Sequence, residues 1–307
     1  MRSSKTLIAA LAFAGLTACA DNTPKTFSGF ITDASMNTVT VRALTDESTC
    51  TFATTDADKS DANGLLLGAE CRYAQIDMFG SRQSISVATY PGRRFTTSIV
   101  HLDRRAESTS DLGKAAGAEI AVNGSYFNVK TFEPVTFVLL DRKIVGRTTP
   151  EEAFRTNGVI AFKDRKGRRM EIFPCDTTQY ADVARRYRSA LAAGPVLIDG
   201  GKVVEYTSGS SFYTRRHPRT LIGKRADGTV VMAVIDGRFK GQGDGATIAE
   251  TAYIARQLGL TEALNLDGGG SSTLWTAQEG VLNHPYDNRR FDHEGERGVP
   301  NCIVVRR

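Results

Sequence analysis

The chain has 307 residues, of which 41% are hydrophobic, 24% charged and 8% aromatic. This balance excludes collagen-like, disordered and polytopic membrane chains, and the length predicts about two domains of about 150 residues each. The formal net charge is +5, and it falls to +3 over 289 residues when residues 1–18 are removed, which is too small an excess to favour nucleic acid as a partner.

The first residues have the composition of an export signal. Arg2 and Lys5 precede an apolar run over 7–14, which is too short to span a bilayer as a mature helix. The following Leu-Thr-Ala-Cys over 16–19 resembles the signal of bacterial lipoproteins, which implies cleavage before Cys19 and lipidation of that cysteine. We therefore expect a cell-envelope protein, held to the outer membrane or facing the periplasm by a lipid anchor. The alternative is a simple secretory signal with an incidental cysteine.

Export would expose the remaining cysteines to oxidising conditions, so they can form disulfides. Their positions suggest the pairs Cys50–Cys71 and Cys175–Cys302. The alternative, that they are buried free thiols packed as small hydrophobic groups, has equal weight. No spacing of cysteine or histidine is typical of a zinc site.

Residues 19–88 read as a small β-rich accessory domain, and residues 89–307 as the domain that carries the chemistry. Short β-branched segments at 27–31, 38–42 and 83–87 are separated by turn residues such as those at 61–64. This first module contains no catalytic grouping.

Helices and strands mix from Tyr90 onward. A helix is predicted from Ser110 to Ala118, followed by a buried strand over 119–124. A second helix is predicted from about 177 to 193, because apolar residues recur at helical spacing before Gly-Pro. The apolar runs on either side of Asp199-Gly200-Gly201 predict a hairpin.

A strand, a helix and a second strand follow in the C-terminal third, over 229–236, 247–258 and 263–267. This order predicts a right-handed parallel crossover, in which both strands end at the same edge of one sheet. The expected fold is therefore α/β (α+β), a mixed sheet with a βαβ unit and flanking helices, preceded by the small all-β module. Asp236 and Asp267 end the two strands, and ligands bind at such edges.

The turn Asp267-Gly268-Gly269-Gly270-Ser271-Ser272 is the sharpest chemical signal. Successive glycines let the backbone approach a ligand and present N–H groups to an anion. The turn matches neither the P-loop nor the dinucleotide fingerprint. The alternative is a tight structural turn. The position of these residues after a buried strand favours the functional interpretation.

Several short motifs follow one another over about 90–307. They are Asn123-Gly124-Ser125-Tyr126-Phe127, Ala193-Gly194-Pro195, His217-Pro218-Arg219-Thr220-Leu221-Ile222-Gly223, Asp236-Gly237-Arg238, Thr247-Ile248-Ala249-Glu250, Leu264 to Ser272, and Glu296-Arg297. In this order they resemble the phosphodiester glycosidase family. The resemblance implies a hydrolase that cleaves sugar-1-phosphodiesters, releasing the sugar and a phosphomonoester.

The same resemblance, set beside the chemistry of the side chains, gives the expected site. Guanidinium groups can grip two phosphate oxygens, and carboxylates can act as nucleophile or as base. The expected catalytic residues are Asp236, Asp267, Glu250 and Glu296. The expected substrate and phosphate ligands are Asn123, Arg219, Thr220, Arg238, Gly268, Gly269, Gly270, Ser271, Ser272 and Arg297.

Structural alternatives exist for several of these residues. Asp236 can simply cap a turn, one of Arg219 and Arg238 can be a surface ion pair, and Glu250 with Thr247 has the form of a helix capping box. The segment around Glu296 can be a solvated loop.

Two other functions compete with the glycosidase. One is a phosphodiesterase that attacks phosphorus, and the other is a lipoprotein that binds glycans without turnover. No cofactor is required for the expected hydrolysis, although carboxylates beside a phosphate are compatible with a divalent cation.

Overall fold

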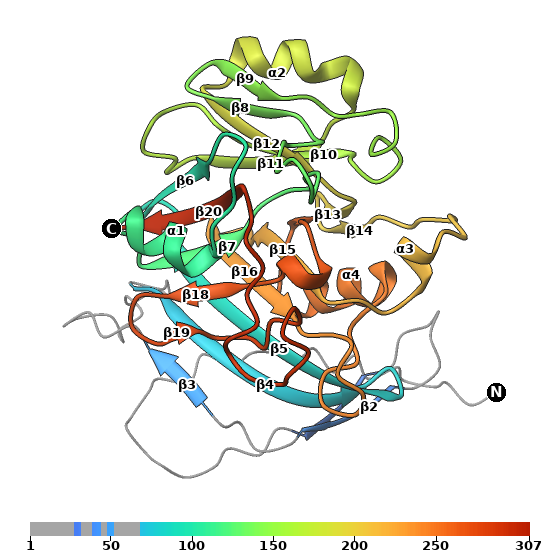
Figure 1. Ribbon diagram of the computed structural model, residues 1–307. Helices are drawn as coiled ribbons and strands as arrows, with labels where there is room; N and C mark the ends of the chain where they lie inside the picture. The colour runs from blue at the N-terminus through green and yellow to red at the C-terminus, as the bar shows by residue number, and fades with distance from the viewer. Residues whose placement is uncertain (1–27, 32–38, 44–47, 52–67) are drawn as a thin grey trace.

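The computed structural model describes residues 28–31, 39–43, 48–51 and 68–307, and of the first three segments only their strands. These residues form three β-sheets with few helices (Figure 1). The predicted signal segment and Cys19 lie outside the described residues. No helix within the described part is long and apolar enough to cross a bilayer.

The largest sheet has ten strands in the order β1-β2-β4-β5-β16-β15-β17-β13-β14, with β3 paired to β4. Its strands are β1 (Ser28–Ile31), β2 (Val39–Ala43), β3 (Ser48–Thr51), β4 (Glu70–Met78), β5 (Ser81–Pro91), β13 (Val196–Asp199), β14 (Lys202–Val203), β15 (Arg219–Lys224), β16 (Thr229–Ile235) and β17 (Glu262–Asn265).

The two smaller sheets have five strands each, in the orders β11-β10-β12-β8-β9 and β19-β18-β7-β20-β6. The first comprises β8 (Val138–Leu140), β9 (Lys143–Gly146), β10 (Gly158–Phe162), β11 (Met170–Pro174) and β12 (Ser189–Ala193). The second comprises β6 (Thr96–His101), β7 (Ile120–Asn123), β18 (Leu274–Thr276), β19 (Gly280–Val281) and β20 (Asn301–Arg306).

Four α-helices occur among the described residues: α1 (Thr109–Ala115), α2 (Tyr180–Arg186), α3 (Ser211–Thr214) and α4 (Ile248–Gln257). Short 3₁₀ turns cover Thr177–Gln179 and Gly269–Ser271. Helix α2 covers the outer face of the sheet that contains β8 to β12 (Figure 1). The expectation of a mixed fold that combines helices with β-sheets is confirmed, and its sheets are mostly antiparallel.

The predicted strand-helix-strand unit is present as β16, α4 and β17, with one difference in topology. Strand β15 lies between β16 and β17 and is antiparallel to both. The two outer strands therefore run in the same direction without being neighbours. As predicted, both end at one edge of the sheet, and β15 begins at that edge.

Strand β16 is buried on both faces, as its continuous apolar sequence predicts. Val230, Met232 and Val234 pack into the core shared by the three sheets, whereas Val231, Ala233 and Ile235 pack against the cluster that includes α4. Alternate side chains of a strand point to opposite faces, so β16 supports both layers at once.

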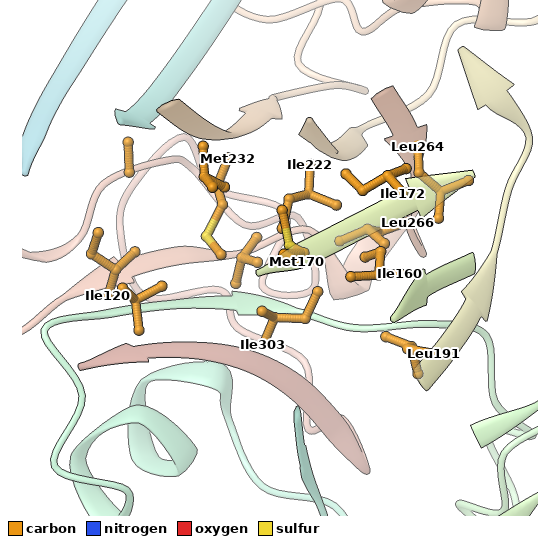
Figure 2. Close-up of a cluster of buried hydrophobic side chains, with 14 of the residues drawn as sticks. Ile120, Ile160, Met170, Ile172, Leu191, Ile222, Met232, Leu264, Leu266 and Ile303 are labelled. Atoms are coloured by element: carbon orange, nitrogen blue, oxygen red, sulfur yellow. The ribbon is translucent and has the colours of Figure 1, made fainter. Parts of the chain in front are cut away.

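The central core lies where the three sheets meet (Figure 2). Ile222, Met232 and Leu264 come from the ten-stranded sheet. The second sheet contributes Ile160, Met170, Ile172 and Leu191, and the third contributes Ile120 and Ile303. One continuous core therefore fixes all three sheets relative to one another.

The ten-stranded sheet runs across the expected domain boundary between residues 88 and 89. That boundary falls inside β5, which pairs along its length with β4 on one side and with β16 on the other. Residues 70–88 therefore belong to the same sheet as the strands that carry Asp236 and Asp267.

The helix predicted over 177–193 is correct only up to Arg186. Residues 189–193 form β12, which pairs with both β10 and β8, and four of its five residues are buried. Pairing on both sides outweighs the helical preference of its alanines, since local propensity is a weak prior against tertiary context.

The predicted disulfide between Cys175 and Cys302 is wrong. Both are buried free thiols, and they pack in separate hydrophobic clusters. Cys50 and Cys71 face each other in the register of β3 and β4, but the side chain of Cys50 lies outside the described side chains. The bridge between Cys50 and Cys71 therefore stays a prediction.

Candidate active site

The candidate site lies at the sheet edge where β16 and β17 end and β15 begins. Pro218, the residue before β15, packs against both Asp-Gly turns. A Cβ added at Gly237 would lie 2.4 Å from the Pro218 nitrogen, and one added at Gly268 would lie 2.5 Å from its carbonyl oxygen. Glycine is therefore needed at both positions, because the two turns and the start of β15 meet there without space for side chains.

Asp267 is the predicted catalytic carboxylate that begins the glycine turn, residues 267–272. Its Oδ1 accepts from the Gly268 backbone N–H at 2.9 Å, and its side chain is partly exposed. Burial raises the pKa of Asp267, while the nearby Ser271 hydroxyl and the charge of Arg155 oppose that rise. A desolvated carboxylate of this kind is a stronger proton acceptor than an ordinary aspartate.

The glycine turn lies beneath charged side chains. Gly269 has a left-handed backbone with φ +64, and a Cβ there would be 3.2 Å from Arg238 Nη2. A Cβ at Gly270 would be 2.4 Å from Arg297 Nη2, and Arg297 forms a two-point ion pair with Asp287 at 2.7 Å for each contact. The absence of side chains lets both guanidinium groups rest on the turn.

Arg219 is buried without an ion pair among the described residues. It is 2% exposed, and its guanidinium donates only to backbone carbonyls, from Nε to Ala246 at 2.9 Å and from Nη2 to Phe212 at 2.6 Å. Burial and the neighbouring charges of Arg155 and Arg238 lower the pKa of Arg219 to about 10. Buried charges are normally paired, and no described carboxylate pairs with this one.

Arg238 is an exposed guanidinium that makes no ion pair among the described side chains. It lies over the Tyr286 ring at 5.1 Å, and its backbone has a φ of +70. Together with Arg219 it gives two positive charges that no described carboxylate pairs with.

Sequence reasoning missed two residues of this site as individual members. His217 precedes Pro218, and burial together with Arg219 and Arg238 lowers the pKa of its imidazole, so it is neutral at neutral pH. Arg155 comes from the turn before β10, and its guanidinium lies 4.0 Å from the centre of the Tyr126 ring. The motif around 217–223 contained a signal for His217, whereas nothing near Arg155 in the sequence points to Asp267.

Asn123 and Thr220 connect the strands of the site to the glycine turn by hydrogen bonds. The Thr220 hydroxyl donates to Asn123 Oδ1 at 2.8 Å, and Asn123 Nδ2 donates to the Asp267 carbonyl at 2.7 Å. The Thr273 N–H also donates to Asn123 Oδ1, at 3.1 Å. Both side chains are fully buried, so their polar groups join β7 and β15 to the glycine turn.

Asp236 is 1% exposed, and both of its oxygens are occupied. Oδ2 accepts from the Ser84 hydroxyl at 2.6 Å and pairs with His284 Nδ1 at 2.8 Å. Oδ1 accepts from Asn283 Nδ2 at 3.1 Å and from the His284 N–H at 2.9 Å. The structure thus places this carboxylate as the anchor of the segment at 283–284 on β5 and β16.

Glu250 and Glu296 are also engaged in structural contacts. Glu250 forms the capping box of α4 with Thr247, and both its oxygens accept from Arg216, at distances from 2.6 to 3.1 Å. Glu296 Oε1 accepts from the Ser110 N–H in the first turn of α1 at 3.0 Å. The capping alternative recognised in the sequence accounts for Glu250.

Ser271 and Ser272 are buried, each 1% exposed, and neither hydroxyl has a hydrogen-bond partner in the part of the chain that the structure describes. The Ser271 hydroxyl lies close enough to Asp267 to lower the pKa of that carboxyl. Among the described residues, no three side chains of His, Cys, Asp or Glu come together as a metal-ligating group.

Comparison with known proteins identifies the family. The profile of the phosphodiester glycosidase family matches residues 116–306. The chain belongs to the phosphodiester glycosidase family. This match covers β7 to β20 and includes all the predicted catalytic and substrate-binding residues.

Two curated relatives support the match over part of their length. Mouse N-acetylglucosamine-1-phosphodiester alpha-N-acetylglucosaminidase is 26% identical over 201 residues, which is 62% of this chain and 37% of the relative. An uncharacterised SPbeta prophage-derived protein of Bacillus subtilis, YomE, is 38% identical over 90 residues, 29% of this chain and 13% of that protein. The chain thus matches well under half the length of each.

Solved structures share the fold. The catalytic domain of zebrafish N-acetylglucosamine-1-phosphodiester alpha-N-acetylglucosaminidase, auto-inhibited by its pro-peptide, matches with a TM-score of 0.62 and 17% identity, over 82% of this chain and 87% of that one. A hypothetical protein from Synechocystis matches with a TM-score of 0.57 and 16% identity, over 78% of this chain and 62% of that one.

Proposed function

We propose that this protein hydrolyses sugar-1-phosphodiesters at the bond between the anomeric carbon and the phosphate oxygen. One observation carries the proposal. The desolvated carboxylate of Asp267 lies at the same sheet edge as Arg219 and Arg238, two cations that have no carboxylate partner among the described residues. The cations suit the phosphodiester anion, and the carboxylate suits proton transfer beside it. Membership of the family supports the same reaction.

A single catalytic carboxylate is sufficient for this reaction. Water adds to the anomeric carbon, its proton passes to Asp267, and the bond from that carbon to the phosphate oxygen breaks. The leaving phosphomonoester has a second pKa of about 6, so it departs without a proton from the protein. Arg219 and Arg238 stabilise the charge that grows on the phosphate as the bond breaks. We therefore assign positioning roles to Asp236, Glu250 and Glu296.

Asp267→Asn tests this assignment. We expect kcat to fall by about a thousandfold, the scale of a lost general base, while the melting temperature does not fall. Asp199→Asn is the matched control, because Asp199 is exposed and also precedes two glycines in a turn. Full activity of Asp267→Asn would remove the assignment.

Hydrolysis in ¹⁸O-labelled water distinguishes the bond that breaks. We expect the label in the released sugar and the opposite anomeric configuration in the product, since the attack on carbon is direct. Label in the phosphate would identify a phosphodiesterase. Binding of sugar phosphodiesters without turnover by the wild-type protein would identify a glycan-binding protein.

We also propose that the protein is exported and attached to the membrane through a lipid on Cys19. The apolar segment at 7–14 and the Leu-Thr-Ala-Cys sequence over 16–19 support this. Replacing Cys19 by serine should move the protein from the membrane fraction to the soluble fraction. Retention in the membrane fraction would contradict the lipid anchor.

A further inference from the structure

We propose that the Phe154 ring is one wall of a subsite beside Asp267 that binds the sugar ring of the substrate. This inference rests on the proposed function and names the side of the site that receives the neutral part of the substrate. The sequence did not single out Phe154, which lies in the turn between β9 and β10.

Phe154 exposes an aromatic ring that is supported on one side. It is 53% exposed and is one of four large hydrophobic side chains exposed in the described part of the chain. Its ring meets the Phe212 ring at 6.0 Å in an edge-on contact and the Tyr213 ring at 6.3 Å. The remaining surface is free for a ligand.

The backbone of Phe154 is fixed. The Tyr213 hydroxyl donates to the Phe154 carbonyl at 2.8 Å, and backbone hydrogen bonds from Arg155 and Thr156 to Glu152 close the turn. The exposed ring is therefore presented from a held position, which limits the entropy lost when a ligand packs against it.

Arg155 connects this ring to the catalytic carboxylate. Its guanidinium lies 5.8 Å from the Phe154 ring and 5.0 Å from the Phe212 ring, and its charge acts directly on the pKa of Asp267. Phe212 also lies 5.0 Å from the guanidinium of Arg219. The Arg155 guanidinium also lies 4.0 Å from the centre of the Tyr126 ring, and the Tyr126 hydroxyl donates to the carbonyl of Leu266, the residue before Asp267, at 3.5 Å. Phe154 is thus connected to the Asp267 turn through Arg155 and Tyr126.

The charge distribution favours a neutral group at Phe154. Arg155 is already paired with Glu152 at 2.6 Å, whereas Arg219 and Arg238 have no carboxylate partner in the described chain. The phosphate therefore belongs with the unpaired Arg219 and Arg238, and the neutral sugar ring belongs beside Phe154 and Arg155. The negative face of an aromatic ring attracts the C–H groups of a pyranose, while Arg155 and Glu152 can hydrogen-bond to its hydroxyls.

Binding measurements on the whole protein test the subsite without turnover. The probes are free glucose, free N-acetylglucosamine and inorganic phosphate, each titrated by calorimetry. In Phe154→Ala, we expect the Kd of whichever sugar binds the wild type to rise about five- to tenfold, as for a lost aromatic contact, and the Kd of phosphate to stay unchanged. Phe154→Tyr should bind like the wild type, and Phe154→Leu like Phe154→Ala.

Val129→Ala is the control, because Val129 is 60% exposed in a different loop. It should change neither affinity, and all variants should melt at the wild-type temperature. Unchanged sugar affinity in Phe154→Ala, an equal loss of phosphate affinity, or no binding of either sugar to the wild type would overturn the proposal. These outcomes are independent of the Asp267→Asn and ¹⁸O results, which test the reaction itself.

Discussion

Arg238 occupies a backbone conformation that glycine adopts more easily. Its φ of +70 lies in the left-handed region, which costs a residue with a side chain about 1–2 kcal/mol. The preceding Gly237 is enclosed by Pro218, so the chain has little freedom to relax there. The Arg238 side chain lies over Gly269, where a phosphate would be bound. Strain of this kind is typical of functional positions.

Arg238→Gly should separate two effects of Arg238, the cost of its left-handed backbone and its binding of phosphate. We expect the free energy of unfolding to rise by up to about 1 kcal/mol, because the left-handed conformation no longer carries a Cβ. We expect KM to rise at least about tenfold, because a charge-assisted hydrogen bond to phosphate is lost. Urea unfolding and steady-state kinetics measure the two effects.

Arg238→Ala is the companion variant, since it removes the guanidinium and keeps the Cβ. It should match Arg238→Gly in KM and be less stable. A wild-type KM in both variants would show that Arg238 is not a phosphate ligand.

The raised pKa of Asp267 predicts the acid side of the pH profile. The ionised carboxylate is the proton acceptor, so kcat/KM should fall as the pH falls through a value above the ordinary 3.8 of an aspartate. A limb at or below that ordinary value would contradict a desolvated base. The profile of kcat/KM against pH for the wild-type protein measures it.

The raised pKa of Asp267 also makes the stability of the protein depend on pH. Because the folded-state pKa of Asp267 is above the unfolded value, its ionisation opposes folding, and its contribution to stability is lost as the pH rises from the unfolded to the folded pKa. Asp267→Asn removes this loss, which is why its melting temperature at neutral pH should not fall.

At the scale of residues, the sequence predicts the site residues that a local pattern marks. Asp267 and its glycines follow a buried apolar strand, and that pattern was sufficient to find them. Arg155 and Phe154 come from a turn in another sheet, and they reach Asp267 only through packing on Tyr126 and Phe212. No local pattern carries that information.

Helix α4 shows how one element can account for an expected catalytic residue. The capping box of Thr247 and Glu250 was readable from the sequence. The partner Arg216, 34 residues earlier, was not, and it uses both oxygens of Glu250 while also donating to the Phe79 carbonyl at 2.6 Å. Glu250 therefore joins α4 to the β4–β5 turn.

Glu250→Gln should lower stability and preserve turnover. Its negative charge is lost opposite an arginine that is about one-third exposed, so we expect a loss of about 1–2 kcal/mol in the free energy of unfolding and an unchanged kcat. Thr247→Ala, which removes only the cap, should cost about 1 kcal/mol. A stable but inactive Glu250→Gln would restore the catalytic role.

At the scale of the whole molecule, the pairing of β5 with β16 joins segments about 145 residues apart. The alternation of residues 83–87 predicted the strand itself, but its neighbour across the sheet is set by the common core. Ser84 of β5 also donates to Asp236, so the N-terminal strands contribute directly to the edge that carries the site.

Truncation tests whether β4 and β5 are part of the catalytic fold. A chain that begins at Tyr90 loses β4 and most of β5, so we expect it to show no cooperative thermal unfolding and no activity. A chain that begins at Gly68 keeps both strands and should unfold cooperatively. Circular dichroism against temperature measures this, and a cooperatively folded chain from Tyr90 would support the boundary at residues 88 and 89.

The position of β20 has a consequence for the order of events during synthesis. Residues 301–306 lie between β7 and β6, so β6 is not joined to the rest of the third sheet until these residues leave the ribosome. A nascent chain that has emerged only as far as residue 300 therefore cannot complete the central core, because β20 contributes Ile303 and Val305 to it. Such a chain has an incomplete core while it is being made, which would suit the export proposed above.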